Sequence, residues 1–436
     1  MPQDTESLKA EMMKEAENLI DMVLKDKGPA EGIKLSEIEQ IAVQVGMKFQ
    51  QMIAQRLVED GQVEKEEEVI CPGCGERLRV KDYRSRRIET EAGEVEVRRA
   101  YYYCQRCQAG FFPLDKRWGL TRSVYSPERA RQMVWLSSLV PYEQAAQVFE
   151  RIGHHSTPSA SIWRQAQQHG ERLKEHSERQ QDFVRVERIV LPPPGQDHRE
   201  RKGGSMDGGM VHIRGEGWKE MKVGAVFDID LRLEHDQRTG ELVEQAHGTN
   251  IAYTGVLGSV DEFAPALWAL AVAQDVPCAA QSSVTADGAE WIWNLVADYF
   301  PDSIQIVDWY HACQHLSDAA YALYPDDPDQ ALSWFRRHQT PLFLGTIHQI
   351  THPLDQAGLP DHSRYFHTHK RRMQYLTFRE EGYPIGSGTV ESSIKQFKAR
   401  LTGPGMRWSR PGAERMLVTR SAVLGCNFDA LWDKAA

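Results

Sequence analysis

The spacing of hydrophobic positions predicts a helical N-terminal region. From about Glu6 to Glu64, apolar residues recur at every third or fourth position, as they do on one face of an α-helix. A polar break that contains glycine and proline, at 27–29, separates two such helices. We assign residues 1–66 to this region and expect a packing or interaction role for it.

The pattern then changes to alternating apolar and polar residues, which predicts β-strands between about 67 and 123. Two Cys-x-x-Cys pairs lie at the ends of this β-type sequence, Cys71 with Cys74 and Cys104 with Cys107. Two such pairs, with a β-hairpin between them, have the spacing of a four-thiolate zinc ribbon. Because four thiolates leave no open coordination position, we expect the Zn²⁺ to be structural.

Helical spacing returns from about 124 to 190. Ser126 and the proline after it are typical of an N-cap followed by the first helical position. A break at 153–159 precedes a second helix, which opens near Ser161 and carries Arg164. A helix, a short turn and a second helix fit a helix-turn-helix that binds a major groove, although generic helix pairs look similar. A Pro- and Gly-containing stretch, 192–204, predicts a linker.

Beyond the linker the order of predicted elements is three strands, helix, strand, helix, strand. The strands are expected at 205–213, 221–227, 250–257, 282–285 and 303–307, and the helices at 260–274 and 289–300. This order is that of an RNase H-like core. A helical stretch, 312–380, interrupts the core before it resumes at 381–425. The predicted fold class is therefore a multi-domain α+β protein: N-terminal helices, a zinc β-ribbon (67–123), a helix-turn-helix-like domain (124–190), and an RNase H-like α/β core (200–311 and 381–425) with a helical insertion.

Composition adds limits on location and partners. No apolar run approaches the roughly 20 residues that span a bilayer, and the start of the chain lacks a signal-peptide pattern. We therefore expect a cytoplasmic protein that acts at the nucleoid, without a membrane partner.

The seven cysteines are an odd number, which argues against a disulfide framework. The net charge is −10, yet 77–131 holds 14 Lys and Arg against 7 Asp and Glu, and 364–420 holds 12 against 4. Such basic blocks fit contact with a phosphate backbone, or else form a solvated charged surface.

Three carboxylates occupy the positions that suit a metal-dependent nuclease. In the predicted core, Asp207 lies on the first strand, Asp287 follows the fourth strand, and Glu391 lies in the first turn of a late helix. Mg²⁺ prefers oxygen ligands, and two such ions held by shared carboxylates stabilise the attacking and leaving oxygens of a phosphodiester. Lys395 and Lys398 follow Glu391 along one helix face, where they would neutralise phosphates or form a solvated face.

Asp308 is the rival for the second carboxylate, because it ends the fifth strand and precedes His311 by three residues. We prefer Asp287, which follows the fourth strand and is flanked by Gly288, a residue that permits close backbone approach. Asp308 and His311 are then expected to be a supporting pair near the site.

In these residues the chain resembles DDE transposases of bacterial insertion sequences, most closely the ISKra-type group, with kinship to Mutator-like and hAT-like transposases. The resemblance covers most of the chain and is most specific in its last segments. It is carried by both cysteine pairs, Phe112–Asp115, Ser205–Gly208, Thr285–Gly288, Asp308–Ala312, Pro384–Glu391 and Gly405–Ser409. Asp308-x-x-His311 looks like the Cys/Asp-x-x-His motif that follows the second catalytic Asp in those relatives, which supports Asp287 as the metal ligand.

The resemblance implies a transposase that binds transposon ends, cleaves a strand and transfers the freed 3′-hydroxyl to target DNA. Asp207, Asp287 and Glu391 would hold two Mg²⁺ ions, with Mn²⁺ as a substitute. The implied partners are the terminal inverted repeats, target DNA and further copies of the chain in a dimer or larger assembly. The residues expected to contact DNA are Arg164, Lys395, Lys398, Arg400, Arg407 and Trp408, the last either stacking on a base or packing in the core. Two alternatives remain: a transposase-derived zinc-containing regulator without catalysis, and a two-metal nuclease that cuts without joining.

Overall fold

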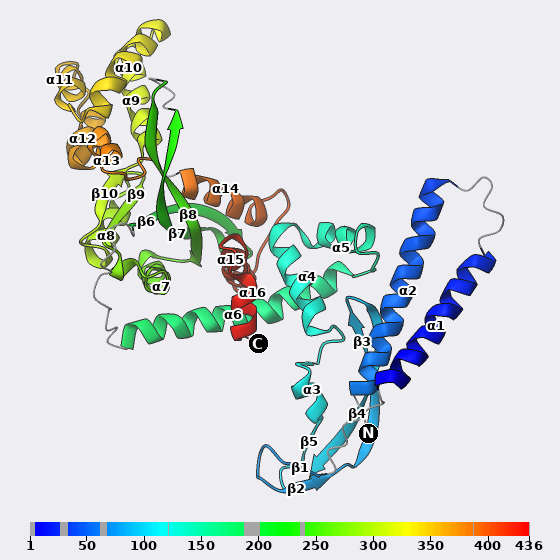
Figure 1. Cartoon of the computed structure of the whole chain (residues 1–436). Helices are drawn as coiled ribbons and strands as arrows, with labels where there is room; N and C mark the ends of the chain where they lie inside the picture. Colours follow the sequence, from blue (N-terminus) through cyan, green and yellow to red (C-terminus); the bar gives the residue numbers. More distant parts are fainter. Residues whose placement is uncertain are drawn as a thin grey trace. The chain divides into compact units, whose positions relative to one another are not determined.

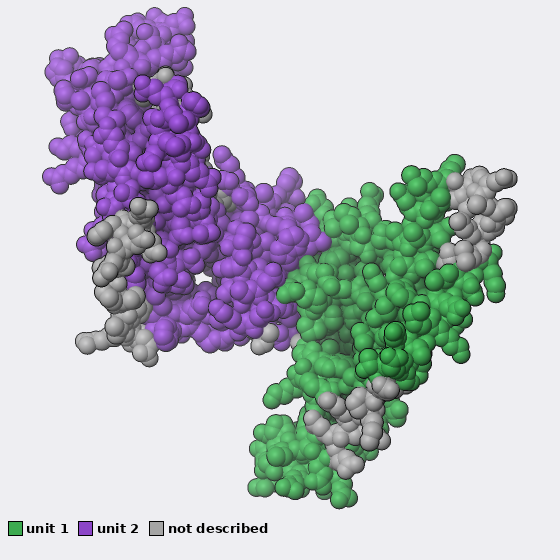
Figure 2. Space-filling view, viewed as in Figure 1, with its two compact units in different colours: residues 1–134, 143–162 green, residues 135–142, 163–436 purple. Residues whose placement is uncertain are grey.

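The computed structural model describes residues 5–26, 34–61, 68–120, 122–186, 201–235, 240–386 and 388–435. These residues form two compact units (Figure 2), one made of 1–134 and 143–162 and the other of 135–142 and 163–436. The predicted break at 27–29 and most of the predicted linker at 192–204 lie outside the described residues. None of the helices described here combines the length and the apolar character that crossing a bilayer requires.

Two long helices open the first unit, as the hydrophobic spacing predicts. They are α1 (Thr5–Asp26) and α2 (Leu35–Gly61). The second helix packs against strand β4 (Gly93–Cys104), and the side-chain amide of Gln51 donates to the carbonyl of Glu94 at 2.8 Å. The helical region is therefore tied to the β-strands that follow it.

The β-type sequence of the first unit forms short hairpins around one long hairpin, as expected between the cysteine pairs. The elements are β1 (Glu68–Ile70), β2 (Arg77–Arg79), β3 (Asp82–Thr90), β4, β5 (Ala109–Phe111) and the short helix α3 (Pro113–Arg117). Strands β1 and β2 pair antiparallel, and β4 pairs antiparallel with both β3 and β5. The long hairpin buries Ile88, Val95 and Val97 toward α2 and α3.

Three helices follow, at the positions predicted for the helix-turn-helix. They are α4 (Pro127–Leu139), α5 (Tyr142–Arg151) and α6 (Ser159–Val186). The hydroxyl of Ser126 accepts a hydrogen bond from the backbone amide of Arg129 at 3.2 Å, which confirms the predicted N-cap. Helix α6 continues to Val186, because Arg, Gln and Glu are good helix formers even where few apolar residues mark the pattern.

The second unit is built on a mixed five-stranded sheet. Its strands are β6 (Arg201–Ile213), β7 (Gly217–His235), β8 (Leu242–Leu257), β9 (Gln281–Ala286) and β10 (Ile304–Val307). Their order across the sheet is β10-β9-β6-β7-β8. The pairs β6–β7 and β7–β8 are antiparallel, and the pairs β6–β9 and β9–β10 are parallel. All five predicted strands are present. Strands β7 and β8 are much longer than the apolar runs that predicted them, because their ladder continues through exposed charged residues to His235 and Leu242.

Helices cover both faces of this sheet (Figure 1). On one face, α7 (Val260–Ala273) and α8 (Glu290–Tyr299) pack on residues such as Val226. On the other face, α14 (Gly388–Leu401) and α15 (Arg410–Leu424) pack on alternate residues of the same strand, such as Phe227. The period of two along a strand sends neighbouring side chains into these two separate cores. The last helix, α16 (Phe428–Ala435), contacts α15.

The predicted helical insertion consists of five helices that gather at one end of the sheet (Figure 1). They are α9 (Trp309–Leu323), α10 (Pro328–Phe343), α11 (His348–Gln356), α12 (Pro360–His369) and α13 (Tyr375–Glu380). Helix α9 contacts α10 and α12, so the insertion packs as one group directly after β10.

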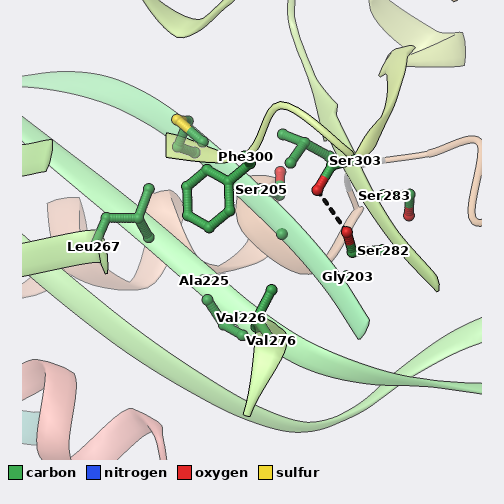
Figure 3. A pocket seen from close by; sticks show the side chains of 13 residues that line it. Gly203, Ser205, Ala225, Val226, Leu267, Val276, Ser282, Ser283, Phe300 and Ser303 are labelled. Atoms are coloured by element: carbon green, nitrogen blue, oxygen red, sulfur yellow. Dashed lines mark hydrogen bonds between the residues drawn. The ribbon is translucent and has the colours of Figure 1, made fainter. Parts of the chain in front are cut away.

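A cavity of about 10 Å³ between the sheet and α7 shows how tightly the start of β6 is packed (Figure 3). A Cβ atom at Gly203 would lie 2.1 Å from Cε2 of Phe227, so only glycine fits there. The hydroxyls of Ser282 and Ser303 lie 2.6 Å apart and join β9 to the turn before β10 (Figure 3). This cavity is a packing defect with room for about one water, not a substrate site.

Candidate functional sites: a four-cysteine cluster and the strand-end carboxylates

The two cysteine pairs form a single cluster. The sulfur atoms of Cys71, Cys74, Cys104 and Cys107 all lie within 4.8 Å of one another. The separations are 3.9 Å between Cys71 and Cys107 and 3.5 Å between Cys74 and Cys104. Four sulfurs placed at about 2.3 Å from one tetrahedral Zn²⁺ would be separated by roughly 3.8 Å, so this cluster fits a zinc ion. The prediction that the four cysteines come together in one cluster is confirmed.

Each pair sits in the turn of a hairpin, which aims two sulfurs at one point. The first pair lies in the turn between β1 and β2, where Gly75 has φ +75°. A Cβ atom at Gly73 would lie 3.1 Å from the sulfur of Cys107, so this glycine lets the two turns approach closely. The backbone amide of Gly73 lowers the pKa of Cys71 to about 7, which favours the thiolate form that binds metal.

The sheet register places three carboxylates at one level. Gly204 of β6 pairs with Val284 of β9, so Asp207 and Asp287, each three residues further on, lie side by side on neighbouring strands. Ala286 pairs with Val307 of β10, which puts Asp308 beside Asp287 in turn. Neighbouring strands are about 4.8 Å apart. Residues separated by 80 positions in the chain thus meet at the end of the parallel strands.

The negative charge of Asp287 acts on the carboxyl group of Asp207. Burial of Asp207 raises the pKa of its carboxyl, and the negative charge of Asp287 raises it further. The backbone amide of Gly208, which donates to Asp207 Oδ1 at 2.5 Å, acts in the opposite direction, as do the charges of Lys398 and His311. The two acidic groups therefore share one electrostatic environment, as the predicted metal site requires.

Asp287 and Asp308 differ in how accessible they are. Asp287 is half-buried, and its Oδ1 accepts from the amide of Ala289 at 2.8 Å. Asp308 is fully buried and is the N-cap of α9, where its Oδ1 accepts from the backbone amide of His311 at 2.8 Å. A buried cap is less suited to bind a hydrated cation than a half-buried neighbour is. The geometry thus favours the predicted preference for Asp287, with Asp308 and His311 as a supporting pair.

The segment before α14 is bound to the ends of β9 and β10. The hydroxyl of Thr285 donates to the carbonyl of Pro384 at 2.9 Å, and the amide of Trp309 donates to the carbonyl of Ile385 at 2.9 Å. These bonds hold the N-terminal end of α14 beside the strand-end acids. Glu391 lies in the first turn of α14, as predicted, although its side chain is outside the described part of the structure.

Lys398 is the predicted DNA-contacting residue that lies nearest to this site. Its Cε would be 3.1 Å from a Cβ at Gly209, and its charge lowers the pKa of Asp207. Lys395, one turn earlier, is exposed, and so are Arg164 at the start of α6 and Arg407. Their role in binding DNA stays a prediction.

Two residues predicted to contact DNA are part of the core. Arg400 is 2% exposed, and its Nε donates to the carbonyl of Ser137 at 2.7 Å while its guanidinium lies over the rings of Tyr142 and Trp408. Trp408 is also buried, and its indole Nε1 donates to the carbonyl of Leu401 at 2.9 Å. Both side chains join α14 to neighbouring elements, so the expectation that they bind DNA is wrong, and the core alternative for Trp408 holds.

Sequence reasoning missed a group of aromatic and basic residues that the insertion places beside Asp287. A Cβ at Gly288 would lie 2.6 Å from Cε2 of Tyr365 and 3.2 Å from Nε2 of His369, both on α12. The ring of His315, from α9, stacks on Tyr365 with centroids 3.6 Å apart. A tyrosine and a histidine four residues apart on one helix face are a weak signal, because nothing in the sequence says which strand end they approach.

His369 is held as a neutral imidazole. Arg372 Nη1 lies 3.1 Å from His369 Nδ1, which must therefore accept, while the other ring nitrogen hydrogen-bonds to the backbone of Gly288. Burial, together with the charges of Arg372 and His315, lowers the pKa of His369 to about 4. The imidazole thus supports the Asp287 turn without adding a positive charge to it.

We expect acid to destabilise the second unit through two buried histidines. Burial lowers the pKa of His369 and of His169 to about 4, while the unfolded value is about 6.5. Between these values the unfolded chain binds more protons, so stability falls as the pH decreases. From pH 7 to pH 5 the loss is about 2 kcal/mol for each histidine.

Urea unfolding of the full chain at both pH values measures this loss. The His369→Gln variant should lose its own share of the pH dependence, about 2 kcal/mol between pH 7 and pH 5. The exposed His367→Gln variant is the control and should behave like the wild type. An identical pH dependence in His369→Gln and the wild type would contradict the assignment.

Comparison of the sequence with protein-family models and with curated proteins finds no match. The candidate sites are therefore defined by their own residues: four cysteines that fit one metal ion, and acidic residues that the sheet brings to one level.

Proposed function

We propose that this chain is a DNA transposase of the DDE type, with Asp207, Asp287 and Glu391 as its catalytic acids. The observation that carries the proposal is the register of the sheet, which sets Asp207 and Asp287 side by side on two parallel strands. Helix α14 brings the first turn that contains Glu391 to the same end of these strands. The resemblance to insertion-sequence transposases selects the same three acids from sequence motifs alone.

The strand order supports an RNase H-like core. Three antiparallel strands followed by two parallel ones, in the order β10-β9-β6-β7-β8, match the element order that predicted this core. The proposed core comprises 200–311 and 381–425, and the five helices α9 to α13 are its insertion. Both faces of the sheet are covered, so the strand ends are the place where polar side chains gather.

The acidic residues suit a hard divalent cation. Asp207 and Asp287 are both half-buried, and burial together with the charge of Asp287 raises the pKa of Asp207. A bound cation would offset this repulsion, and Mg²⁺ and Mn²⁺ prefer oxygen ligands. When bound, a pair of such ions lowers the pKa of a water and stabilises charge on the phosphodiester oxygens. Asp207, Asp287 and Glu391 would hold the ions, and Lys398 would attract the phosphate next to Asp207.

The remaining elements would bind DNA and organise the assembly. The cysteine cluster fits a structural zinc ribbon with no open coordination position, so it would fix the hairpins rather than catalyse. Exposed Arg164 at the start of α6 and exposed Lys395 and Arg407 would contact the DNA backbone. Two transposon ends must be held together, so a dimer or larger assembly is proposed, with α1 and α2 as the candidate interface.

An assay with three DNA readouts tests this proposal. The full chain is mixed with labelled duplexes that carry the inverted repeats flanking its coding sequence, a target plasmid and Mg²⁺. Joined products support a transposase. Cut ends without joining would make the protein a nuclease, and binding without any product would make it a regulator.

A further inference from the structure

Tyr365 has a buried hydroxyl with no hydrogen-bond partner among the described residues. The ring lies on α12, and the atoms of Tyr365 nearest to a Cβ at Gly288 are Cε2 and Cζ of the phenol end, at 2.6 and 3.3 Å. The hydroxyl therefore lies on the side of the ring that faces the Asp287 turn. An unsatisfied buried donor costs about 1–3 kcal/mol, so its position requires an explanation.

The ring of Tyr365 is held in place by its neighbours. His315 stacks on one side with a centroid distance of 3.6 Å, and His369 lies at 5.0 Å on α12 itself. His369 is in turn fixed by Arg372 and by the backbone of Gly288. A phenol fixed in this way presents its hydroxyl in one direction only, at little entropic cost.

Acidic residues lie near Tyr365. The charges of Asp287 and Asp308 both act on its phenol, and Asp287 directly precedes the glycine that the ring edge approaches. Asp287 Oδ1 already accepts from Ala289, and Asp308 Oδ1 from His311. The second carboxylate oxygen of Asp287 would give the phenol donor an acceptor.

We propose that Tyr365 is a positioning residue of the strand-end site, whose hydroxyl donates to the second carboxylate oxygen of Asp287 when a divalent cation is bound and fixes the orientation in which that carboxylate holds the ion. This inference rests on the proposed function. It adds a residue from the helical insertion to a site otherwise built from the sheet and α14. Partners that orient a metal ligand typically change metal affinity by 10–100-fold when they are removed.

The test measures Mn²⁺ affinity of the full chain without DNA, by electron paramagnetic resonance. Tyr365→Phe removes the hydroxyl and keeps the ring that packs on His315 and Gly288, and its expected effect is a 10–100-fold weaker Kd. Tyr375→Phe is the matched control. The hydroxyl of Tyr375 is also buried and has no partner among the described residues, and the charge of Asp308, not that of Asp287, acts on it. Tyr375→Phe should leave the Kd for Mn²⁺ within about threefold of the wild-type value. If buried phenols had a structural role alone, Tyr365→Phe and Tyr375→Phe would change the Kd to the same extent.

The outcomes separate this inference from the proposed function. If Asp287→Asn abolishes Mn²⁺ binding and Tyr365→Phe has the wild-type Kd, the role of Tyr365 is overturned and the metal site stands. If the wild type binds Mn²⁺ no better than Asp287→Asn, both are overturned. Thermal unfolding checks the fold of each variant. If Tyr365→Phe fails to fold, the Gly288→Ala variant is used instead. Its added methyl group would push against the edge of the Tyr365 ring, and the same loss of Mn²⁺ affinity is expected.

Discussion

Replacing Asp207 with Asn should abolish Mg²⁺-dependent strand cleavage while leaving the binding of transposon ends unchanged. The amide keeps the shape of the side chain in β6 but removes the negative charge that a cation needs. The loss of rate should be at least about 10³-fold, because charge stabilisation by the bound ions carries most of the barrier reduction in such chemistry. Asp287→Asn and Glu391→Gln should have the same effect. Cleavage of labelled end duplexes and gel-shift binding to the same duplexes are the two measurements.

The stability of the metal-free protein gives this prediction a second, independent readout. The raised pKa of Asp207 means that the folded state binds its proton more tightly than the unfolded state does. Its ionised form therefore destabilises the fold at pH values above the unfolded pKa of about 3.9, and the cost is fully present above the folded pKa. Asp207→Asn should raise Tm at pH 7 and leave it unchanged at pH 3.

Asp308→Asn is the informative control, because its effects differ according to whether Asp308 binds the metal ion or only caps helix α9. Asp308 is fully buried and caps α9, so its substitution should lower the free energy of unfolding by about 0.5–2 kcal/mol. Cleavage should be reduced far less than by Asp287→Asn. Retained strand transfer by Asp287→Asn, combined with its loss in Asp308→Asn, would make Asp308 the second metal ligand instead.

Much of the fold could be predicted from local pattern. The helices and strands of the second unit occur where apolar periodicity places them, and the cysteine spacing predicted one four-sulfur cluster. The outer parts of β7 and β8 were not predicted. In β7, Leu231 and Leu233 alternate with Asp230, Arg232 and Glu234, which is a strand-type pattern, but both leucines are exposed and the segment buries no core face. The length of this hairpin depends on the pairing of β7 with β8, which one segment alone does not reveal.

The candidate site was predictable only as far as it depends on chain order. Strand order put Asp207 and Asp287 in one region, and the sequence favoured Asp287 over Asp308 from its place after the fourth strand and its neighbour Gly288. The difference in burial between these two acids, which follow parallel strands at the same level, could not be predicted from the sequence. Arg400 shows the opposite error. A basic residue in a basic helix suggested DNA contact, yet its guanidinium is buried against Tyr142 and Trp408. Tyr365 was missed because its closeness to Gly288 arises from how α12 folds back.

Removal of zinc should unfold the cysteine-bearing end of the first unit and leave the second unit folded. The core at this end is small: its buried residues are Cys71, Leu78, Tyr102 and Cys104, so two of the four are cysteines of the cluster itself. Strands β1, β2 and β5 have three residues each, too few to be stable without the metal. Zinc binding contributes about 10–16 kcal/mol in small zinc domains, far more than this core supplies.

Hydrogen exchange with and without a chelator would locate the effect, and zinc content would quantify it. Amides of β1, β2 and β5 should lose protection in the metal-free chain, whereas β6 and β7 should keep theirs, because they belong to the other compact unit. Cys71→Ser should reproduce the loss and reduce zinc from one ion per chain to much less than one. Cys278→Ser, which changes a cysteine outside the cluster, is the control and should retain the full ion. If Cys71→Ser instead kept one tightly bound zinc and full protection in β1 and β2, the metal could not be what holds these hairpins together.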